Sequence, residues 1–268
     1  MKLSEVYAVL NEAAPKALSD EYVQRYGAYD NSGLLIDTGK DVTAVVFTLD
    51  LTEEAVNRAI EMGAQLIVTH HPVIYGKINH LCVDEPQGKK MIRCLSRGIS
   101  IVSMHLNLDV VNGGIDESLQ KGILLAAKRV GGEAQAIEGC MQPVSCGGYG
   151  RMTMVNGASL EVLKKGLREE FSADVRSVGE KQEVNKIASF CGAGVDEGTI
   201  AYAAANGADV MISADWKHHL ILAAREAGMA VIQLSHYASE IYGFRNYYER
   251  MRQAIGLPCE LVTQDEMA

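Results

Sequence analysis

The sequence lacks the features that mark several classes of protein. No two of its six cysteines form a C-x-x-C pair, so they are expected to be reduced, mostly buried thiols. No run of 18 apolar residues occurs, and the residues after Met1 are amphipathic where a signal segment would be apolar. These absences argue against a disulfide framework and a membrane span, and they predict a cytoplasmic protein.

An excess of positive charge is also missing. The 25 Lys and Arg residues are outnumbered by 34 Asp and Glu residues, which gives a formal net charge of −9. Such a chain is poorly suited to binding a nucleic-acid backbone by bulk electrostatics. The phosphate loop G-x-x-x-x-G-K-[ST] and the nucleophile elbow G-x-S-x-G are absent as well. An anionic substrate would therefore need local positive charge, which bound metal ions could supply.

From residue 42 onward, short apolar runs alternate with amphipathic stretches. Strands are predicted at 42–49, 66–69 and 99–103, with helices at 52–62 and 89–96 between them. This βαβαβ order indicates a parallel sheet flanked by helices, so the fold class is α/β.

The same order returns in the second half of the chain. The predicted strands and helices there are 186–190, 196–206, 210–213, 220–226 and 230–234. We therefore predict two related lobes with mostly parallel sheets, 1–125 and 126–268, fused as one unit without an inserted domain. The alternative is that any two βαβ units resemble each other this closely.

The most informative stretch is His70-His71-Pro72, which follows the apolar run 64–69. Pro72 cannot donate to a sheet ladder and so ends the strand. Ligands of open α/β sheets bind at the carboxyl ends of the strands, where both imidazoles would lie. A single histidine is more often a partly buried core residue than a ligand, but two in this place favour metal binding.

Two His-x3-carboxylate pairs repeat this chemistry after later apolar runs. They are His105 with Asp109, and His236 with Glu240. In a helix, His236 and Glu240 share one face. In an extended segment, His105, Asn107 and Asp109 all face one way. Each pair taken alone is equally consistent with a simple hydrogen bond.

Taken together, these residues form a candidate ligand set for metal ions. It consists of His70, His71, His105, Asp109, His236 and Glu240. Imidazole and carboxylate donors suit zinc, iron or manganese better than calcium or magnesium. Six ligands are too many for one catalytic zinc, which usually takes three. The set predicts two divalent transition-metal ions per chain, which could clamp both sides of a reacting group.

Other polar residues near these runs have less specific interpretations. Asp50 ends the first predicted strand and is expected to cap the helix at 52–62; the alternative is that it accepts a hydrogen bond from a metal ligand. The second double histidine, His218-His219, is expected at the start of a helix, as a polar lip or a substrate contact. His80 is expected to be solvated.

Five segments, in order along the chain, resemble a known family. They are Asp30-Asn31-Ser32-Gly33-Leu34, Thr69-His70-His71-Pro72, His105-Leu106-Asn107-Leu108-Asp109, Ser213-Ala214-Asp215-Trp216-Lys217-His218-His219 and His236-Tyr237-Ala238-Ser239-Glu240. The family is that of the dinuclear-metal-centre proteins known as GTP cyclohydrolase 1 type 2 homologues, or Ngg-interacting-factor-three-like proteins. The resemblance covers nearly the whole chain.

The resemblance implies the same six ligands, two α/β lobes with the metal site in the cleft between them, and assembly into a ring-like homohexamer. The chain departs from the family pattern at two places. Tyr29-Asp30 stands where a Trp-Asp pair is common, and Ser213-Ala214-Asp215 stands where a Thr-Gly-Asp/Glu turn is common. Neither departure removes a ligand.

These observations lead to two alternative hypotheses about function, which belong to different classes. The first is a dinuclear metal-dependent hydrolase that acts on a nucleotide-like small molecule, by cyclohydrolase-like or phosphoesterase-like chemistry. Asp215, His218 and His219 are candidate proton donors for it by position. The alternative is a metal-binding oligomeric protein with a regulatory or interaction role and no turnover.

Overall fold

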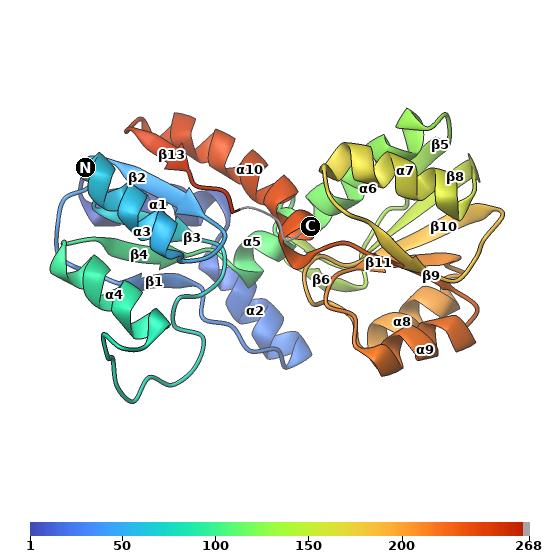
Figure 1. Ribbon diagram of the computed structural model, residues 1–268, viewed down its shortest axis with the longest axis horizontal. Coiled ribbons are helices and arrows are strands. Elements are labelled where there is room, and N and C mark those ends of the chain that lie inside the picture. The colour runs from blue at the N-terminus through green and yellow to red at the C-terminus, as the bar shows by residue number, and fades with distance from the viewer. Residues whose placement is uncertain (265–268) are drawn as a thin grey trace. The chain divides into compact units, whose positions relative to one another are not determined.

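The computed structural model describes residues 1–264, which form two compact units (Figure 1). Unit 1 consists of Met1–Val111 together with Phe244–Gln264, and the described part of unit 2 is Asn112–Gly243. Unit 1 is therefore discontinuous in sequence, whereas the two predicted lobes, 1–125 and 126–268, meet at a single boundary. The reason is that the last helix and strand of the chain pack onto the first sheet.

The sheet of unit 1 has the strand order β1-β4-β3-β2-β13. Its strands are β1 Gly33–Ile36, β2 Val45–Thr48, β3 Leu66–Thr69, β4 Ser100–Ser103 and β13 Cys259–Leu261. β2, β3, β4 and β13 are parallel to one another, and β1 runs antiparallel beside β4. Every residue of β2, β3 and β4 is buried, as expected for parallel strands covered on both faces.

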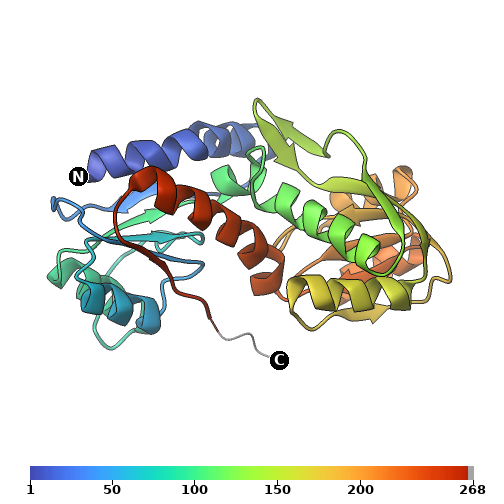
Figure 2. The same cartoon turned by 90° about the horizontal axis from the view of Figure 1, so that it is seen from above.

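Helices cover both faces of this sheet (Figure 2). They are α1 Leu3–Ala13, α2 Lys16–Tyr26, α3 Glu53–Met62, α4 Pro86–Ser96, the short α5 Leu106–Val110 and α10 His236–Ile255. One face packs Val46, Ile67 and Ile101 into a core with α3 and α4. On the other, the ring of Phe47 contacts Tyr247 of α10, whose hydroxyl donates to the carbonyl of Leu10 in α1.

The main sheet of unit 2 has the strand order β5-β8-β10-β11-β12-β9. Its strands are β5 Glu133–Ala136, β8 Arg151–Ala158, β9 Arg176–Val178, β10 Val184–Ser189, β11 Val210–Ser213 and β12 Ala230–Gln233. A small two-stranded sheet adds β6 Gln142–Val144 and β7 Gly147–Tyr149. β10, β11 and β12 are parallel, but β5, β8 and β9 pair antiparallel.

The expectation of mostly parallel sheets therefore holds for unit 1 only, and unit 2 has a mixed sheet. The physical reason lies at its edges. β5 and β9 are largely exposed, whereas all of β11 is buried. Antiparallel strands tolerate water on one face, but parallel strands need cover on both.

The helices of unit 2 lie on two sides of its sheet (Figure 1). They are α6 Ile115–Arg129 and α7 Leu160–Phe171 on one side, and α8 Glu197–Ala205 and α9 His218–Glu226 on the other. A glycine sets the spacing of α6 and α7, because a Cβ at Gly166 would lie 2.2 Å from the carbonyl oxygen of Ala126. Only glycine permits that approach.

Two further expectations can be compared with the described residues. All six cysteines are free, but only Cys94 and Cys191 are buried, so the expectation of mostly buried thiols is wrong. Cys82 and Cys146 lie in exposed loop and turn positions, which no local sequence pattern predicts. Among residues 1–264, no helix has both the length and the apolar character that crossing a membrane requires.

Candidate metal centre

Three histidines of unit 1 lie together at one edge of its sheet. His70 and His71 follow β3 directly, and His105 follows β4 after one residue. β3 and β4 are adjacent and parallel, so their carboxyl ends meet at the same edge. The ring centroid of His70 lies 4.9 Å from that of His71 and 5.2 Å from that of His105. One ring nitrogen of each histidine lies within 4.8 Å of the others, a spacing that suits a metal site.

Each of these rings is held through its Nδ1 atom. The partner is the carbonyl oxygen of Met104 for His70 at 2.7 Å, Asp50 for His71 at 2.8 Å and Asp30 for His105 at 2.7 Å. Carbonyl and carboxylate oxygens only accept, so Nδ1 carries the proton. In the neutral imidazole, Nε2 is then the nitrogen with the lone pair. Metal-binding histidines are commonly oriented in this way.

Asp109 joins this cluster from α5. Its Oδ1 lies 3.5 Å from Nε2 of His70, and both side chains are buried. The expectation of an extended segment here is wrong, because 106–110 is helical and His105 precedes it as the cap residue. Asp109 is therefore one helical turn from His105. Asn107 points elsewhere and donates to the carbonyl of Ala14 at 2.7 Å.

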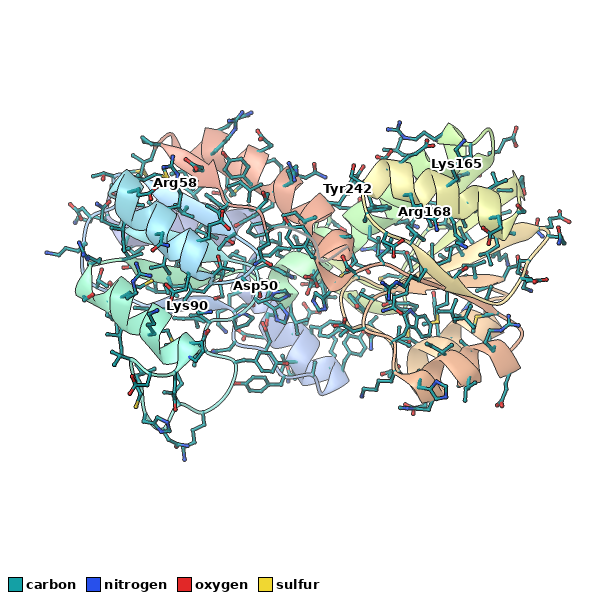
Figure 3. The ribbon with its side chains drawn as sticks, viewed as in Figure 1. Asp50, Arg58, Lys90, Lys165, Arg168 and Tyr242 are labelled. Atoms are coloured by element: carbon teal, nitrogen blue, oxygen red, sulfur yellow. The ribbon has the colours of Figure 1, made fainter. Side chains whose placement is uncertain are left out.

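Asp50 orients His71; the expectation that it caps the following helix is wrong. The cap of α3 is Thr52, whose side chain accepts the N–H of Ala55 at 3.0 Å. Asp50, labelled in Figure 3, also accepts from Gln264 at 3.1 Å. Burial raises the pKa of Asp50, but the hydrogen bonds from His71 and Gln264 outweigh it, and the net shift is downward. The residue therefore stays ionised beside His71.

Asp30 was not among the predicted site residues, although it lies in one of the five segments that carry the family resemblance. Its carboxylate binds His105 and also accepts from the hydroxyls of Ser19 and Ser32. Burial raises the pKa of Asp30, but these bonds and the charge of His105 lower it to about 2. Burial lowers the pKa of His105, and the bond to Asp30 and the charge of Asp109 raise it overall.

The position of Asp30 beside His105 can be predicted only when the strand pairing is known. β1 runs antiparallel to β4, and Gly33 pairs with Ser103 at the end of β4. The residues that precede β1 therefore lie at the same sheet edge as His105. Nothing in the local sequence indicates that pairing.

In unit 2, His236 and Glu240 form a second pair at the corresponding edge of the other sheet. They lie in the first turns of α10, which follows β12, and Nε2 of His236 lies 3.0 Å from Oε1 of Glu240. The prediction that a helix places both on one face is confirmed. Asp215, after β11, binds Nδ1 of His236 at 2.6 Å, so this ring is oriented like those of unit 1.

The backbone around this pair is strained or crowded. Asp215 has φ +49°, an uncommon conformation for a residue other than glycine. A Cβ at Gly192, which follows β10, would lie 2.4 Å from Oε1 of Glu240. Gly192 therefore leaves room for the carboxylate.

The remaining histidines lie outside both clusters. His218 and His219 begin α9, as predicted, and are exposed; Nε2 of His219 lies 4.0 Å from Glu197. His80 is exposed, as predicted, and pairs with Glu85 at 2.9 Å. Asp215 is engaged with His236. Of the three candidate proton donors, the structure therefore brings only Asp215 to a candidate metal ligand, where it orients the ring of His236.

The donor chemistry of the two clusters fits transition-metal ions. Unit 1 offers three imidazole nitrogens and one carboxylate, and unit 2 offers one of each. The fit rests on the Nδ1 hydrogen bonds, which fix the tautomer that a metal ligand needs.

Comparisons with known proteins show what the chain is similar to. A curated relative from Clostridium perfringens (strain 13 / Type A), named GTP cyclohydrolase 1 type 2 homolog, is 29% identical over 99% of this chain and 97% of its own. The solved structure of the Staphylococcus aureus hypothetical protein SA1388 is 26% identical with a TM-score of 0.79, covering 99% of this chain and 97% of that one. Reduced HcgD from Methanocaldococcus jannaschii is 25% identical with a TM-score of 0.79, covering 97% of both.

The sequence model of one family spans almost the whole chain. It is described as Duf34/NIF3 (NGG1p interacting factor 3) and matches residues 1–266. The match includes every histidine and carboxylate of the two clusters. This chain belongs to the Duf34/NIF3 family.

Proposed function

We propose that the protein is a hydrolase that uses two divalent transition-metal ions to act on a nucleotide-like small molecule. The ligands are His70, His71, His105, Asp109, His236 and Glu240. The observation that carries the proposal is that all four histidines donate from Nδ1 to a fixed oxygen. Four independent rings held in the metal-binding tautomer are hard to explain by a purely structural role.

The six ligands are assigned to one two-metal centre because the family resemblance implies them as a single set.

Bound ions would supply Lewis acidity and an activated water at neutral pH. The residues of the chain hold the rings and carboxylates in place for this. Asp30, Asp50 and Asp215 each fix one ring. Their negative charge also favours cation binding. The nucleotide-like substrate is suggested by the name of the curated relatives, GTP cyclohydrolase 1 type 2 homolog.

We further propose that the protein works in the cytoplasm as a homohexamer. The family resemblance suggests the hexamer, and the free state of all six cysteines is in keeping with a reducing compartment. Light scattering should report six copies, and a monomeric mass at micromolar concentration would contradict this.

Metal content tests the ligand assignment. Elemental analysis of protein loaded with zinc, iron or manganese should find about two ions per chain. His70→Ala and Glu240→Ala should each lower that number, while His218→Ala serves as an exposed histidine control. Full occupancy in both ligand variants would refute the assignment.

A backbone variant tests Glu240 without removing a ligand. Gly192→Ala should displace the Glu240 carboxylate and lower metal occupancy. Gly207→Ala is the matched control, because Gly207 also has positive φ, +70°, but a Cβ there would meet only Nζ of Lys186, at an ordinary contact distance of 3.9 Å. Equal occupancy in the two variants would count against a role for Glu240.

Turnover separates the enzyme from a protein that only binds metal. GTP and p-nitrophenyl phosphate should be hydrolysed by metal-loaded protein and not by chelated protein. Glu240→Gln, which keeps the size of the side chain but removes its charge, should abolish the activity. Two bound ions with no turnover across such a panel would favour the regulatory or interaction role.

A further inference from the structure

Two tyrosines of unit 1 are exposed side by side. Tyr29 is 55% exposed and Tyr75 is 56% exposed. Their ring centroids lie 5.1 Å apart, with the rings 76° from coplanar. Large aromatic side chains are costly to expose, so an exposed pair calls for an explanation.

The pair adjoins the histidine cluster through the chain itself. Tyr29 immediately precedes Asp30, the residue that holds His105. Tyr75 lies four residues after His71, and its ring centroid is 6.4 Å from that of His105. The two segments are tied together by Asn31, whose Nδ2 donates to the carbonyl of Ile74 at 2.6 Å.

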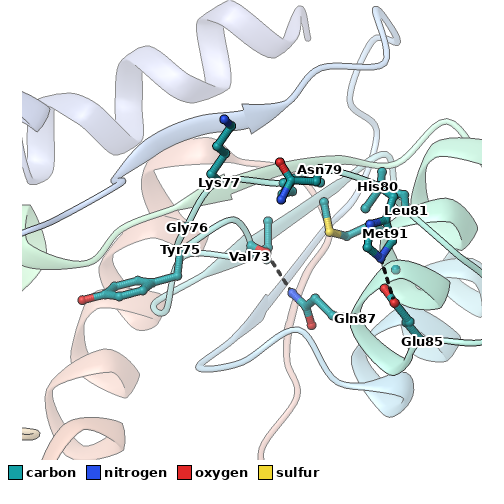
Figure 4. Close-up of a pocket in the computed structure, with 12 residues that line it drawn as sticks. Val73, Tyr75, Gly76, Lys77, Asn79, His80, Leu81, Glu85, Gln87 and Met91 are labelled. Atoms are coloured by element: carbon teal, nitrogen blue, oxygen red, sulfur yellow. Dashed lines mark hydrogen bonds and ion pairs between the residues drawn. The ribbon is translucent and has the colours of Figure 1, made fainter.

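Tyr75 lies in a loop that borders an open pocket. The pocket has a volume of about 330 Å³, and its lining includes Tyr75 as well as Ile78, Leu81 and Met91. Figure 4 shows the Tyr75 ring pointing away from Leu81 and Met91. The ring is therefore not packed against these apolar side chains of the pocket, and it lies beside His105 instead.

We propose that Tyr29 and Tyr75 form a subsite that binds the planar ring of the substrate, a nitrogen heteroaromatic of the purine nucleoside type. This proposal rests on the proposed function, because the ring would present the rest of the substrate to the histidine cluster. A tyrosine face stacks on any base, and the metal ions would supply the positive charge that the chain lacks for an anionic group.

Stacking on an aromatic side chain strengthens binding by an amount that is easy to measure. Removing one ring should weaken the binding of a purine nucleoside about tenfold. Removing only the hydroxyl should change little, because the ring face makes the contact.

The test is a titration with inosine, monitored by NMR, of wild-type protein in metal-free and zinc-loaded form. Tyr75→Ala and Tyr29→Ala should each weaken inosine binding, and Tyr75→Phe should restore it. Val83→Ala is the control, because Val83 lies in the same loop and is 60% exposed. Ribose at the same concentrations should not bind. Inosine carries no phosphate, so the subsite is tested even if the protein binds no metal.

Three results would overturn the proposal. The first is inosine binding that is equal in wild type and both alanine variants, and the second is no saturable binding of inosine to wild type. The third is a change of oligomeric mass in Tyr75→Ala, which would assign the pair to a protein interface. If wild-type protein bound inosine but no metal, the metal centre would be refuted and the tyrosine subsite would be retained.

Discussion

The two units share the arrangement of four neighbouring strands but carry different chemistry. In unit 1, β2, β3 and β4 are parallel, and antiparallel β1 lies beside β4. In unit 2, β10, β11 and β12 are parallel, and antiparallel β9 lies beside β12. Both third strands are followed by a His-x3-carboxylate pair. After the second strands, however, unit 1 has His70-His71 and unit 2 has Ala214-Asp215.

This difference shows that the sheet edge sets where donors lie, and the sequence at each strand end sets which donors they are. In unit 1, the ring of His105 is held by Asp30, whose side chain is 1% exposed. In unit 2, the ring of His236 is held by Asp215, whose side chain is 53% exposed. The carboxylate that orients His105 is therefore buried, whereas the one that orients His236 is open to water.

The largest expected difference between the units concerns stability. In unit 2, the buried carboxylate of Asp116 accepts from Arg151 at 3.1 Å, from the N–H of Gly150 at 3.0 Å and from the N–H of Cys191 at 3.3 Å. Asp116→Ala leaves a buried cation without its partner and should cost about 3–5 kcal/mol. Urea unfolding of the metal-free protein measures this. The exposed pair of Lys16 and Asp20 in unit 1 is the control, and Asp20→Ala should leave the midpoint unchanged.

A smaller effect concerns the residues that orient the rings. Asp30→Asn should weaken zinc binding about 10- to 100-fold, because such outer partners commonly contribute that much. Asp215→Asn should weaken it less, since water already competes for the exposed carboxylate. Competition with a zinc chelator compares the two variants. An equal loss of zinc affinity in both variants would show that burial of the orienting carboxylate does not matter. A larger loss in Asp215→Asn would show that the exposed carboxylate matters more than the buried one.

The smallest effect concerns the helix starts. In unit 1, α3 is capped by the neutral Thr52, and in unit 2 Glu117 of α6 accepts the N–H of Gly113 at 2.8 Å. Burial raises the pKa of Glu117, but Lys121 and that N–H lower it overall from its ordinary 4.5.

The pKa of Glu117 is lowered in the folded state, so its ionised carboxylate adds to the free energy of unfolding above pH 4.5. This stabilisation is lost as the pH falls through the folded-state pKa. Glu117→Gln should cost about 0.5–1 kcal/mol at neutral pH and progressively less in acid. Thr52→Ala should cost about 1 kcal/mol without this acid dependence. Unfolding curves of wild type and both variants at pH 7 and pH 3 measure these losses. If Glu117→Gln lowered the free energy of unfolding equally at both pH values, the contribution would not come from the ionised carboxylate.

The central strands and the ligand-bearing strand ends could be predicted from the sequence. β3 and β11 have the predicted bounds, because four consecutive apolar or small residues between a glycine-ended helix and a polar stop can only be buried strands. The antiparallel edge strands of unit 2 were harder to place. β5 and β9 are short and largely polar, so their sheet positions depend on partners far away in sequence.

The donors of the site were predictable, but the residues that hold them mostly were not. His70 and His71 stand out because two imidazoles after an apolar run have no simple core role. Asp30 and Asp215 bind rings that are 75 and 21 residues away in sequence, so only the folded chain reveals them. Tertiary pairing, rather than local pattern, positions these two carboxylates.

The discontinuity of unit 1 has a consequence for how the chain is made. β13 pairs with β2 from more than 200 positions later in the sequence, and the rings of Phe244, Tyr247 and Tyr248 all contact Phe47. During synthesis, domains form as their residues leave the ribosome. Unit 2 has all of Asn112–Gly243 available before Phe244–Gln264 has been made. The unit that begins first is thus the one that is completed last. Until α10 and β13 have been made, its sheet lacks an edge strand and one of its faces is only partly covered.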